Sequence, residues 1–129
     1  FRLVHFDAVS KARPGDFVDL TITDASAHYL IGQEAQGIVI ESLGRGNLPP
    51  TMLDSIERAL SVGIYIVIVS RCYSGRVLDT YAYNGGGKDL TNRGCILGGS
   101  LNGQKARILL MLAISNDYEY EDVKQLFKL

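Results

Sequence analysis

The stretch IYIVIV, residues 64–69, decides the fold, because its almost continuously β-branched composition is typical of a strand covered on both faces. A second short apolar run, residues 38–40, predicts another strand of the same kind. Between the two runs, apolar residues at 53, 56 and 60 recur at helical spacing and stop before Gly63. A buried strand, a helix and a buried strand in succession predict two parallel strands joined by a crossover helix.

The same patterns predict further elements on either side. We expect strands at 17–23 and 95–97, and helices at 25–35, 88–93, 103–115 and 119–128. Asn102 is the expected N-cap of the helix 103–115, which is apolar on nearly every side and is therefore expected to be buried. This order of elements predicts an α/β domain. It would be a small three-layer, Rossmann-like domain, with a mainly parallel four-stranded sheet and helices on both faces.

Length and composition limit the possible classes. The chain has 129 residues, 47% of them hydrophobic and 21% charged, which fits one folded domain. We expect residues 1–16 to be a linker or lead-in segment and 17–129 to be the domain. A net charge of −1 gives no basic field for nucleic acid, and no apolar run reaches the roughly 18 residues of a membrane helix. Because the chain begins with Phe1, we expect a fragment or a processed product.

The two cysteines, Cys72 and Cys95, do not form a metal-binding pattern. Neither belongs to a CxxC motif, and the two histidines, His5 and His28, lie far away in the sequence. We interpret the cysteines as two small, partly buried residues, and a disulfide between them remains an alternative.

The loop Gly44-Arg45-Gly46-Asn47 is the strongest candidate site, because ligands of parallel sheets bind at the carboxyl ends of the strands. Three interpretations are open. A phosphate cradle is disfavoured, since Pro49 stands where a third glycine is needed and no Walker lysine is present. The others are a tight turn before a proline-capped helix, and a site where Asn47 presents its amide to a small polar molecule. We favour the last.

Other residues are weaker candidates. Asp24, Ser70 and Arg71 are expected at strand ends, where single polar residues usually act as caps or surface ion-pair partners. No serine, histidine and aspartate set is convincingly spaced, and the GxSxG motif is absent. Lys88 and Asp89 are neighbours in sequence, so on a helix they would not face one another. From the residues alone, the chain is an α/β domain with a ligand-facing loop at 44–50.

Four segments in order resemble the bacterial L-asparaginase family, especially its type II-like members. They are GIVIESLGRGNLPP (37–50), VIVSRC..GRV (67–77), YAYNGGG..L...G.I.GG.L (81–101) and SLNGQKARILLMLAIS (100–115). The resemblance covers about residues 17–128 and concerns only the smaller, C-terminal domain of that family. The family's nucleophilic threonine lies in a TGGTI-like motif of a larger N-terminal domain, with further groups in a GTDT-like motif. Neither motif is present here, so no catalytic residue is assigned to this chain.

The resemblance implies a role for this half of the protein. In the family, L-asparagine is hydrolysed to L-aspartate and ammonia through an acyl-enzyme on threonine. Each site is completed by the C-terminal domain of a neighbouring subunit, and the position that matches its substrate-binding asparagine is Asn47. The implied partners are L-asparagine or L-glutamine, the protein's own N-terminal domain and further subunits of a homo-oligomer. No metal or organic cofactor, nucleic acid or membrane is implied, and localisation stays open between cytoplasmic and exported.

The sequence departs from the type II pattern in one segment. Residues 72–94 are rich in glycine, and Asp79 is the only acid there before Asp89, with Tyr81 or Tyr83 as possible replacements for a substrate-binding carboxylate. The preference between asparagine and glutamine therefore stays open. Two alternatives remain for the function: a domain of a glutamine or asparagine amidotransferase, and a non-catalytic α/β module that binds a small molecule.

Overall fold

The computed structural model describes residues 4–5, 22–25, 30–32 and 36–128. The chain divides into two compact units, residues 1–36 and 37–129. The first unit contains three short strands, β1 (Val4–His5), β2 (Ile22–Ala25) and β3 (Leu30–Gly32), in the order β1-β3-β2. β1 runs parallel to β3, and β2 pairs with β3 in the antiparallel direction.

Two expectations for the first unit need correction. The predicted helix 25–35 is wrong where the structure describes it, because Ala25 belongs to β2 and Leu30–Gly32 forms β3. Here strand pairing, of β3 with the distant β1 and with the neighbouring β2, overrides the helical spacing of the apolar residues. The predicted strand 17–23 overlaps β2 only at residues 22–23, and β2 pairs with β3 rather than with the parallel sheet. The remaining parts of these segments, and residues 1–16 apart from β1, lie outside the described residues.

The second unit is an α/β domain built on a parallel sheet. Its elements are β4 (Gly37–Ser42), the 3-10 turn η1 (Pro50–Met52), α1 (Leu53–Ser61), β5 (Tyr65–Ser70), α2 (Gly87–Arg93), β6 (Ile96–Leu97), α3 (Gly103–Ser115) and α4 (Tyr120–Leu126). The sheet order is β4-β5-β6, with both pairs parallel. The described residues thus give this sheet three strands, where the sequence predicted four.

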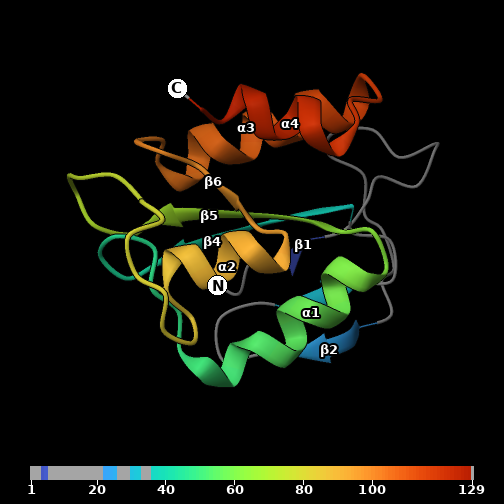
Figure 1. Ribbon diagram of the computed structural model, residues 1–129. Helices are drawn as coiled ribbons and strands as arrows, with labels where there is room; N and C mark the ends of the chain where they lie inside the picture. Colours follow the sequence, from blue (N-terminus) through green and yellow to red (C-terminus); the bar gives the residue numbers. More distant parts are fainter. Residues whose placement is uncertain (1–3, 6–21, 26–29, 33–35, 129) are drawn as a thin grey trace. The chain divides into compact units, whose positions relative to one another are not determined.

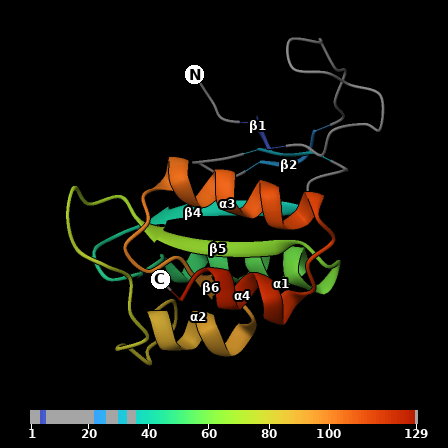
Figure 2. The same cartoon turned by 90° about the horizontal axis from the view of Figure 1, so that it is seen from above.

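Helices cover both faces of this sheet. In Figure 1, α3 and α4 lie above it and α1 and α2 lie below it, and the turned view in Figure 2 shows α3 running along β4 and β5. The crossovers β4–α1–β5 and β5–α2–β6 therefore pass on the same face, and the chain changes face only after β6. This arrangement leaves the carboxyl ends of the strands and their loops together at one edge.

The central strand β5 supplies the middle of the core. Ile66, Val67, Ile68 and Val69 are at most 1% exposed, as expected for a strand covered on both faces. Val67 and Val69 contact the apolar cluster of α3 and α4, which includes Ala106, Leu110, Ala113, Val123 and Phe127. Because side chains alternate along a strand, Ile66 and Ile68 point to the other face, which α1 and α2 cover (Figure 1).

Local signals at the helix ends are confirmed. Asn102 caps α3 by accepting a hydrogen bond from the backbone N–H of Lys105 at 2.9 Å. Gly63 and Gly94 follow α1 and α2 with φ values of 85° and 105°, the left-handed region in which glycine is favoured. The predicted strands at 38–40, 64–69 and 95–97 are also present, with bounds shifted by one or two residues.

The burial predicted for α3 is only half right. Ala106, Leu110 and Ala113 are buried against the sheet, but three large apolar residues on the outer side, Ile108, Met111 and Leu112, are exposed by 59%, 53% and 57%. A helix lying on a sheet buries one stripe of its surface. The apolar residues of α3 are more numerous than that stripe can hold, so the others remain outside.

Candidate functional site

β4 and β5 end at the same level of the sheet. Their register runs from Gly37 opposite Tyr65 to Ser42 opposite Ser70, so the loops that follow start side by side. The backbone N–H of Arg71 donates to the Ser42 carbonyl at 2.9 Å and prolongs this pairing by one residue. The two loops therefore form one surface at the carboxyl edge, the edge where ligands of parallel sheets are expected.

The loop after β4 is a tight turn held by its own backbone. Leu43 and Asn47 exchange hydrogen bonds, with N–O distances of 3.1 Å and 3.0 Å. Between them, Gly44 and Gly46 adopt φ values of 53° and 111°, which a residue with a Cβ atom rarely adopts. The two glycines are therefore explained by the geometry of the turn, and the turn fixes the backbone of Asn47.

Asn47 is the candidate binding residue from the sequence, and its side chain is unusual. The residue is half-buried, and its Oδ1 atom is buried without a hydrogen-bond partner among the residues that the structure describes. A buried acceptor left unsatisfied costs about 1–3 kcal/mol, so nearly all such atoms in proteins find a donor. The amide of Asn47 thus has unused hydrogen-bonding capacity at the edge where a ligand is expected.

The two serines at this edge have structural contacts. The Ser42 hydroxyl is buried and donates to the Val69 carbonyl at 2.7 Å. The Ser70 hydroxyl donates to the Gly44 carbonyl at 2.7 Å and accepts the N–H of Cys72 at 3.1 Å. Both hydroxyl protons are therefore committed to backbone carbonyls, and neither serine is paired with a base that could activate it. Ser70, a candidate ligand group from the sequence, instead supports the turn at Gly44.

Arg71 and Asp24, the other two candidates at strand ends, belong to different units of the chain. Arg71 is exposed and directly precedes Cys72 in the sequence. Asp24 lies within β2 of the first unit, opposite Ile31, so it does not belong to a strand of the parallel sheet. The strand that was expected to end at Asp24 instead continues to Ala25.

The two cysteines are free and occupy opposite environments. Cys72 is exposed, and the neighbouring Ser70 side chain first, the Gly44 backbone second and the charge of Arg71 last lower the pKa of its thiol. Cys95 is buried, and desolvation raises the pKa of its thiol to about 12. The interpretation as partly buried residues is thus wrong for Cys72, and the disulfide is not formed.

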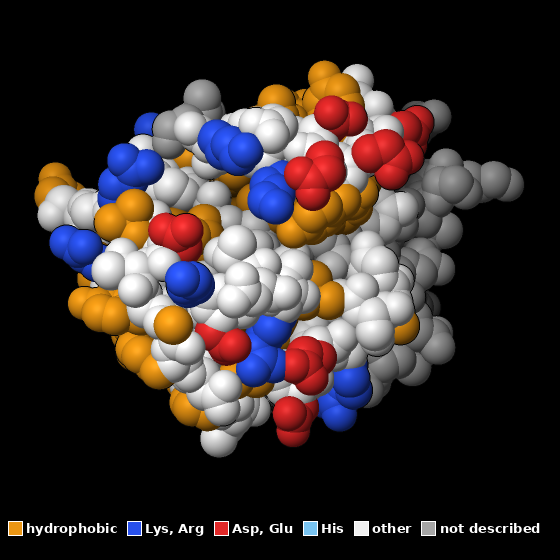
Figure 3. Space-filling model, viewed as in Figure 1, with side chains coloured by type: hydrophobic (Ala, Val, Ile, Leu, Met, Phe, Trp, Pro, Cys, Tyr) orange, Lys and Arg blue, Asp and Glu red, His pale blue; other side chains and the backbone are white. Residues whose placement is uncertain are grey.

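The long loop after β5 adds exposed side chains to the edge. Tyr73, Tyr81 and Tyr83 are exposed by 106%, 42% and 54%, and the rings of Tyr81 and Tyr83 lie 5.7 Å apart. Asp79 is exposed in the same loop. Hydrophobic and basic side chains gather at the left edge of the molecule in Figure 3, the side to which β5 points in Figure 1. Exposed residues of this edge include Leu43, Arg45, Arg71, Tyr73 and Arg76.

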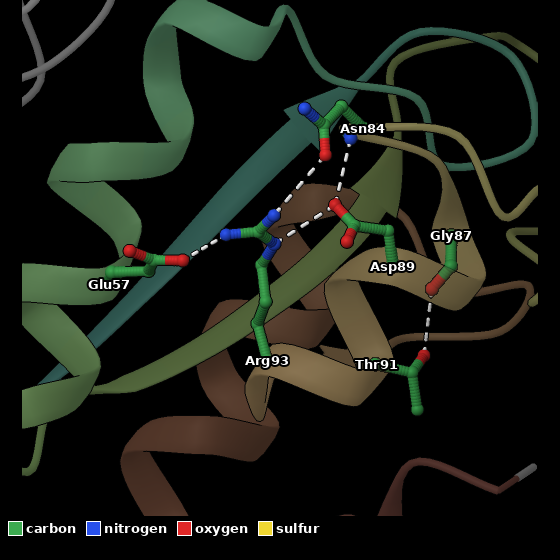
Figure 4. Close-up of polar contacts among 7 residues, drawn as sticks. Glu57, Asn84, Gly87, Asp89, Thr91 and Arg93 are labelled. Carbon is green, nitrogen blue, oxygen red and sulfur yellow. Dashed lines mark hydrogen bonds and ion pairs between the residues drawn. The ribbon is translucent and has the colours of Figure 1, made fainter.

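A polar network that joins α1, α2 and the loop before α2 was not predicted from the sequence. Arg93 on α2 reaches Asp89, Glu57 on α1 and the side chain of Asn84 (Figure 4). The spacing of Asp89 and Arg93, four residues apart on a helix, was a usable signal for the pair. Sequence reasoning considered Asp89 only with its neighbour Lys88 and so overlooked it.

A hollow of about 340 Å³ lies near the amino end of β5 rather than at the carboxyl edge; its lining includes Tyr65, Arg93, Gly94 and Tyr120. Its polar groups are occupied, because the Tyr120 hydroxyl donates to the Gly94 carbonyl and the Tyr65 hydroxyl donates to the Tyr118 carbonyl. Within residues 4–5, 22–25, 30–32 and 36–128, no three His, Cys, Asp or Glu residues are grouped to hold a metal, and no helix could cross a membrane.

The site defines a class: an α/β domain that presents an asparagine from a rigid glycine turn at the carboxyl edge of a parallel sheet. Residues 20–127 match the family described as Glutaminase/Asparaginase C-terminal domain, and the chain belongs to this family. It is similar to an L-asparaginase of Bacillus licheniformis, with 35% identity over 120 residues that cover 89% of this chain and 37% of the relative. A probable L-asparaginase of Deinococcus radiodurans is 37% identical over 95 residues, covering 74% of this chain and 29% of the relative.

A third relative has a different name. It is a glutamyl-tRNA(Gln) amidotransferase component of Pyrococcus abyssi, and it is 30% identical over 120 residues, which cover 92% of this chain and 25% of that protein. The chain therefore spans between a quarter and somewhat over a third of the length of these relatives.

Proposed function

We propose that this chain is the C-terminal domain of an L-asparaginase, which hydrolyses L-asparagine to L-aspartate and ammonia. The proposed protein has a larger N-terminal domain with the nucleophilic threonine and forms a homo-oligomer. In it, Asn47 reaches the active site of a neighbouring subunit and binds in the substrate region. The chain alone is expected to be inactive.

One observation carries the proposal: within the described part of the chain, the buried Oδ1 atom of Asn47 has no hydrogen-bond partner, and the turn holds the backbone of this residue in place. A binding group that is fixed before the ligand arrives loses little freedom on binding. Because the Oδ1 atom is covered in this structure, the side-chain amide would turn outward on its fixed backbone before a donor of the substrate or of the neighbouring subunit reaches it. The committed hydroxyls of Ser42 and Ser70 agree with a nucleophile supplied by another part of the protein.

The amidotransferase alternative is supported by the similarity to the Pyrococcus abyssi protein. In that case the ammonia released from an amide would be passed to tRNA-linked chemistry. Both alternatives use the same half-site, so they differ in the acceptor of the ammonia and not in the role of Asn47. The non-catalytic binding module remains the alternative from another class.

Ammonia release from L-asparagine and L-glutamine tests the proposal, with the 129-residue chain and the full-length gene product assayed side by side. We expect activity only in the full-length protein. There, Asn47→Ala should lower kcat/KM for asparagine by about 10- to 100-fold, the loss of a hydrogen bond to a charged or polarised group.

The control is Asn116→Ala. It removes an exposed asparagine at the C-terminal end of α3 and should leave kcat/KM unchanged. Activity of the short chain by itself would refute the half-site. No activity in either protein would favour the binding module, and equal kinetics of Asn47→Ala and the unaltered protein would remove Asn47 from the site.

A further inference from the structure

We infer that Asp89 is a positioning residue for Asn47: it fixes the backbone of Gly85, and Gly85 fixes the loop residue next to Asn47. The inference rests on the proposed role of Asn47 and adds a residue to the same site. It also gives a role to the glycine-rich segment 84–87.

The first link joins Asp89 to Gly85. One carboxylate oxygen, Oδ2, accepts the backbone N–H of Gly85 and the Nε–H of Arg93, both at 2.9 Å. Figure 4 shows the Arg93 guanidinium between this carboxylate and Glu57 of α1, with a further contact to Asn84 Oδ1 at 3.4 Å. Asp89 is therefore held in place by a side chain that is anchored on two helices.

The environment strengthens these hydrogen bonds. The side chains of Asp89 and Arg93 are 18% and 23% exposed, so water screens them less than a surface pair. The Arg93 side chain, and after it the Gly85 backbone, hold the pKa of the Asp89 carboxyl below its usual range. The group is therefore ionised near neutral pH, and hydrogen bonds to an ionised acceptor are stronger than neutral ones.

The second link joins Gly85 to the Asn47 turn. The Gly85 carbonyl accepts the N–H of Leu48 at 2.9 Å. Gly85 adopts a φ of 87°, and a Cβ atom at this position would collide with the Leu48 carbonyl oxygen. The two backbones are thus in direct contact, and a shift of Gly85 moves Leu48, which is covalently joined to Asn47.

A parallel contact supports the other side of the turn. Gly87, at the start of α2, packs against the Leu78 carbonyl so closely that a Cβ atom would collide with it. Leu78 in turn donates its N–H to the Arg45 carbonyl at 3.0 Å. The segment that Asp89 orders therefore braces the turn at Arg45 as well as at Leu48.

The test is a double-mutant cycle in the full-length gene product, with ammonia release from L-asparagine as the assay. Asp89→Ala should lower kcat/KM about tenfold when Asn47 is present, because small displacements of a binding group have large kinetic effects. In the Asn47→Ala background, Asp89→Ala should lower kcat/KM less than about twofold, since the Asn47 amide that it positions is already absent. Thermal unfolding of each variant sets an assay temperature at which all are folded.

The outcomes separate this inference from the proposed function. A purely structural role would lower the active fraction equally in both backgrounds, and equal losses would overturn the inference while leaving Asn47 in the site. No effect of Asn47→Ala would overturn both. Asp117→Asn, at an exposed position after α3 whose φ of 55° asparagine tolerates, is the matched control and should be neutral.

If Asp89→Ala does not fold, Arg93→Gln provides the cycle. It removes the anchor of the carboxylate but keeps the acceptor for Gly85. We expect Arg93→Gln to lower kcat/KM about threefold, and we expect this effect to disappear in the Asn47→Ala background. A loss of the same size in both backgrounds would reject the positioning role.

Discussion

The loops after β4 and β5 leave the same edge of the sheet, but they are held in different ways. From Leu43 to Leu48 the backbone is fixed by bonds within the turn and by bonds to Gly85 and Leu78, and Gly46 and Leu48 are buried. Residues 73–76 are exposed, and among the described residues they make no hydrogen bond. The first loop holds the backbone of Asn47 in place, whereas the segment 73–76 of the second loop presents exposed residues that these hydrogen bonds do not hold.

The largest effect should come from the glycines of the two regions. Gly85→Ala places a methyl group against the Leu48 carbonyl at a φ of 87°, whereas at Gly75, with a φ of 110°, a Cβ atom meets nothing within 4 Å. Both changes strain the backbone, but only Gly85→Ala also displaces the held turn. We expect it to lower the free energy of unfolding by at least about 2 kcal/mol more than Gly75→Ala.

Denaturant unfolding of the full-length gene product measures this difference. Equal losses for the two variants would show that the clash at Leu48 is relieved by a small shift. The turn would then be less firmly held than its hydrogen bonds indicate.

Within the first loop, two leucines give a smaller contrast. Leu48 is 7% exposed and belongs to the core, while Leu43 is 54% exposed. Leu48→Ala should therefore cost about 2–3 kcal/mol of stability, and Leu43→Ala less than about 0.5 kcal/mol. The same unfolding experiment checks both. A large loss at Leu43 would mean that its side chain is covered in the assembled protein.

The cysteines give a contrast in reactivity rather than stability. Cys72, at the start of the exposed loop, has a lowered pKa and should react quickly with a thiol reagent near pH 8. Cys95 should be protected until the domain unfolds, since it is buried and its pKa is raised to about 12. Peptide-resolved mass spectrometry of the full-length gene product follows the two sites separately, and similar rates would contradict the burial of Cys95.

The raised pKa of Cys95 also fixes the sign of a pH effect. When the chain unfolds, the thiol returns towards its ordinary value of 9.0, so above that pH the folded state holds more protons than the unfolded state. Its contribution to stability is complete below about pH 9 and decreases as the pH rises from there towards 12. Cys95→Ala should remove this dependence, which denaturant unfolding at a series of pH values measures.

Much of the second unit could be predicted because its signals are local. The β-branched run 64–69, the cap at Asn102 and the glycines that end α1 and α2 act through neighbours in sequence, and the structure confirms them. The turn around Asn47 was also recognisable, since two glycines before two prolines leave few backbone conformations.

The errors arose where distant segments decide. The helix predicted at 25–35 depended on spacing alone, and pairing of β3 with β1 and β2 replaced it. The role of Asp89 depends on contacts of Arg93 with Glu57, 36 residues away. The burial of the outer residues of α3 was predicted wrongly, because sequence periodicity does not tell how wide a stripe of the helix the sheet covers.

The way the Asn47 turn is held has a consequence for protein engineering. Its shape depends on backbone amides and carbonyls and on the Ser70 hydroxyl, while the side chains of Leu43 and Arg45 are exposed and contribute little to it. These two positions are therefore open to randomisation, with the two glycines, Asn47 and Leu48 kept. A library of variants at positions 43 and 45 would change the side chains around the Asn47 amide, while the backbone of the turn that positions Asn47 stays the same.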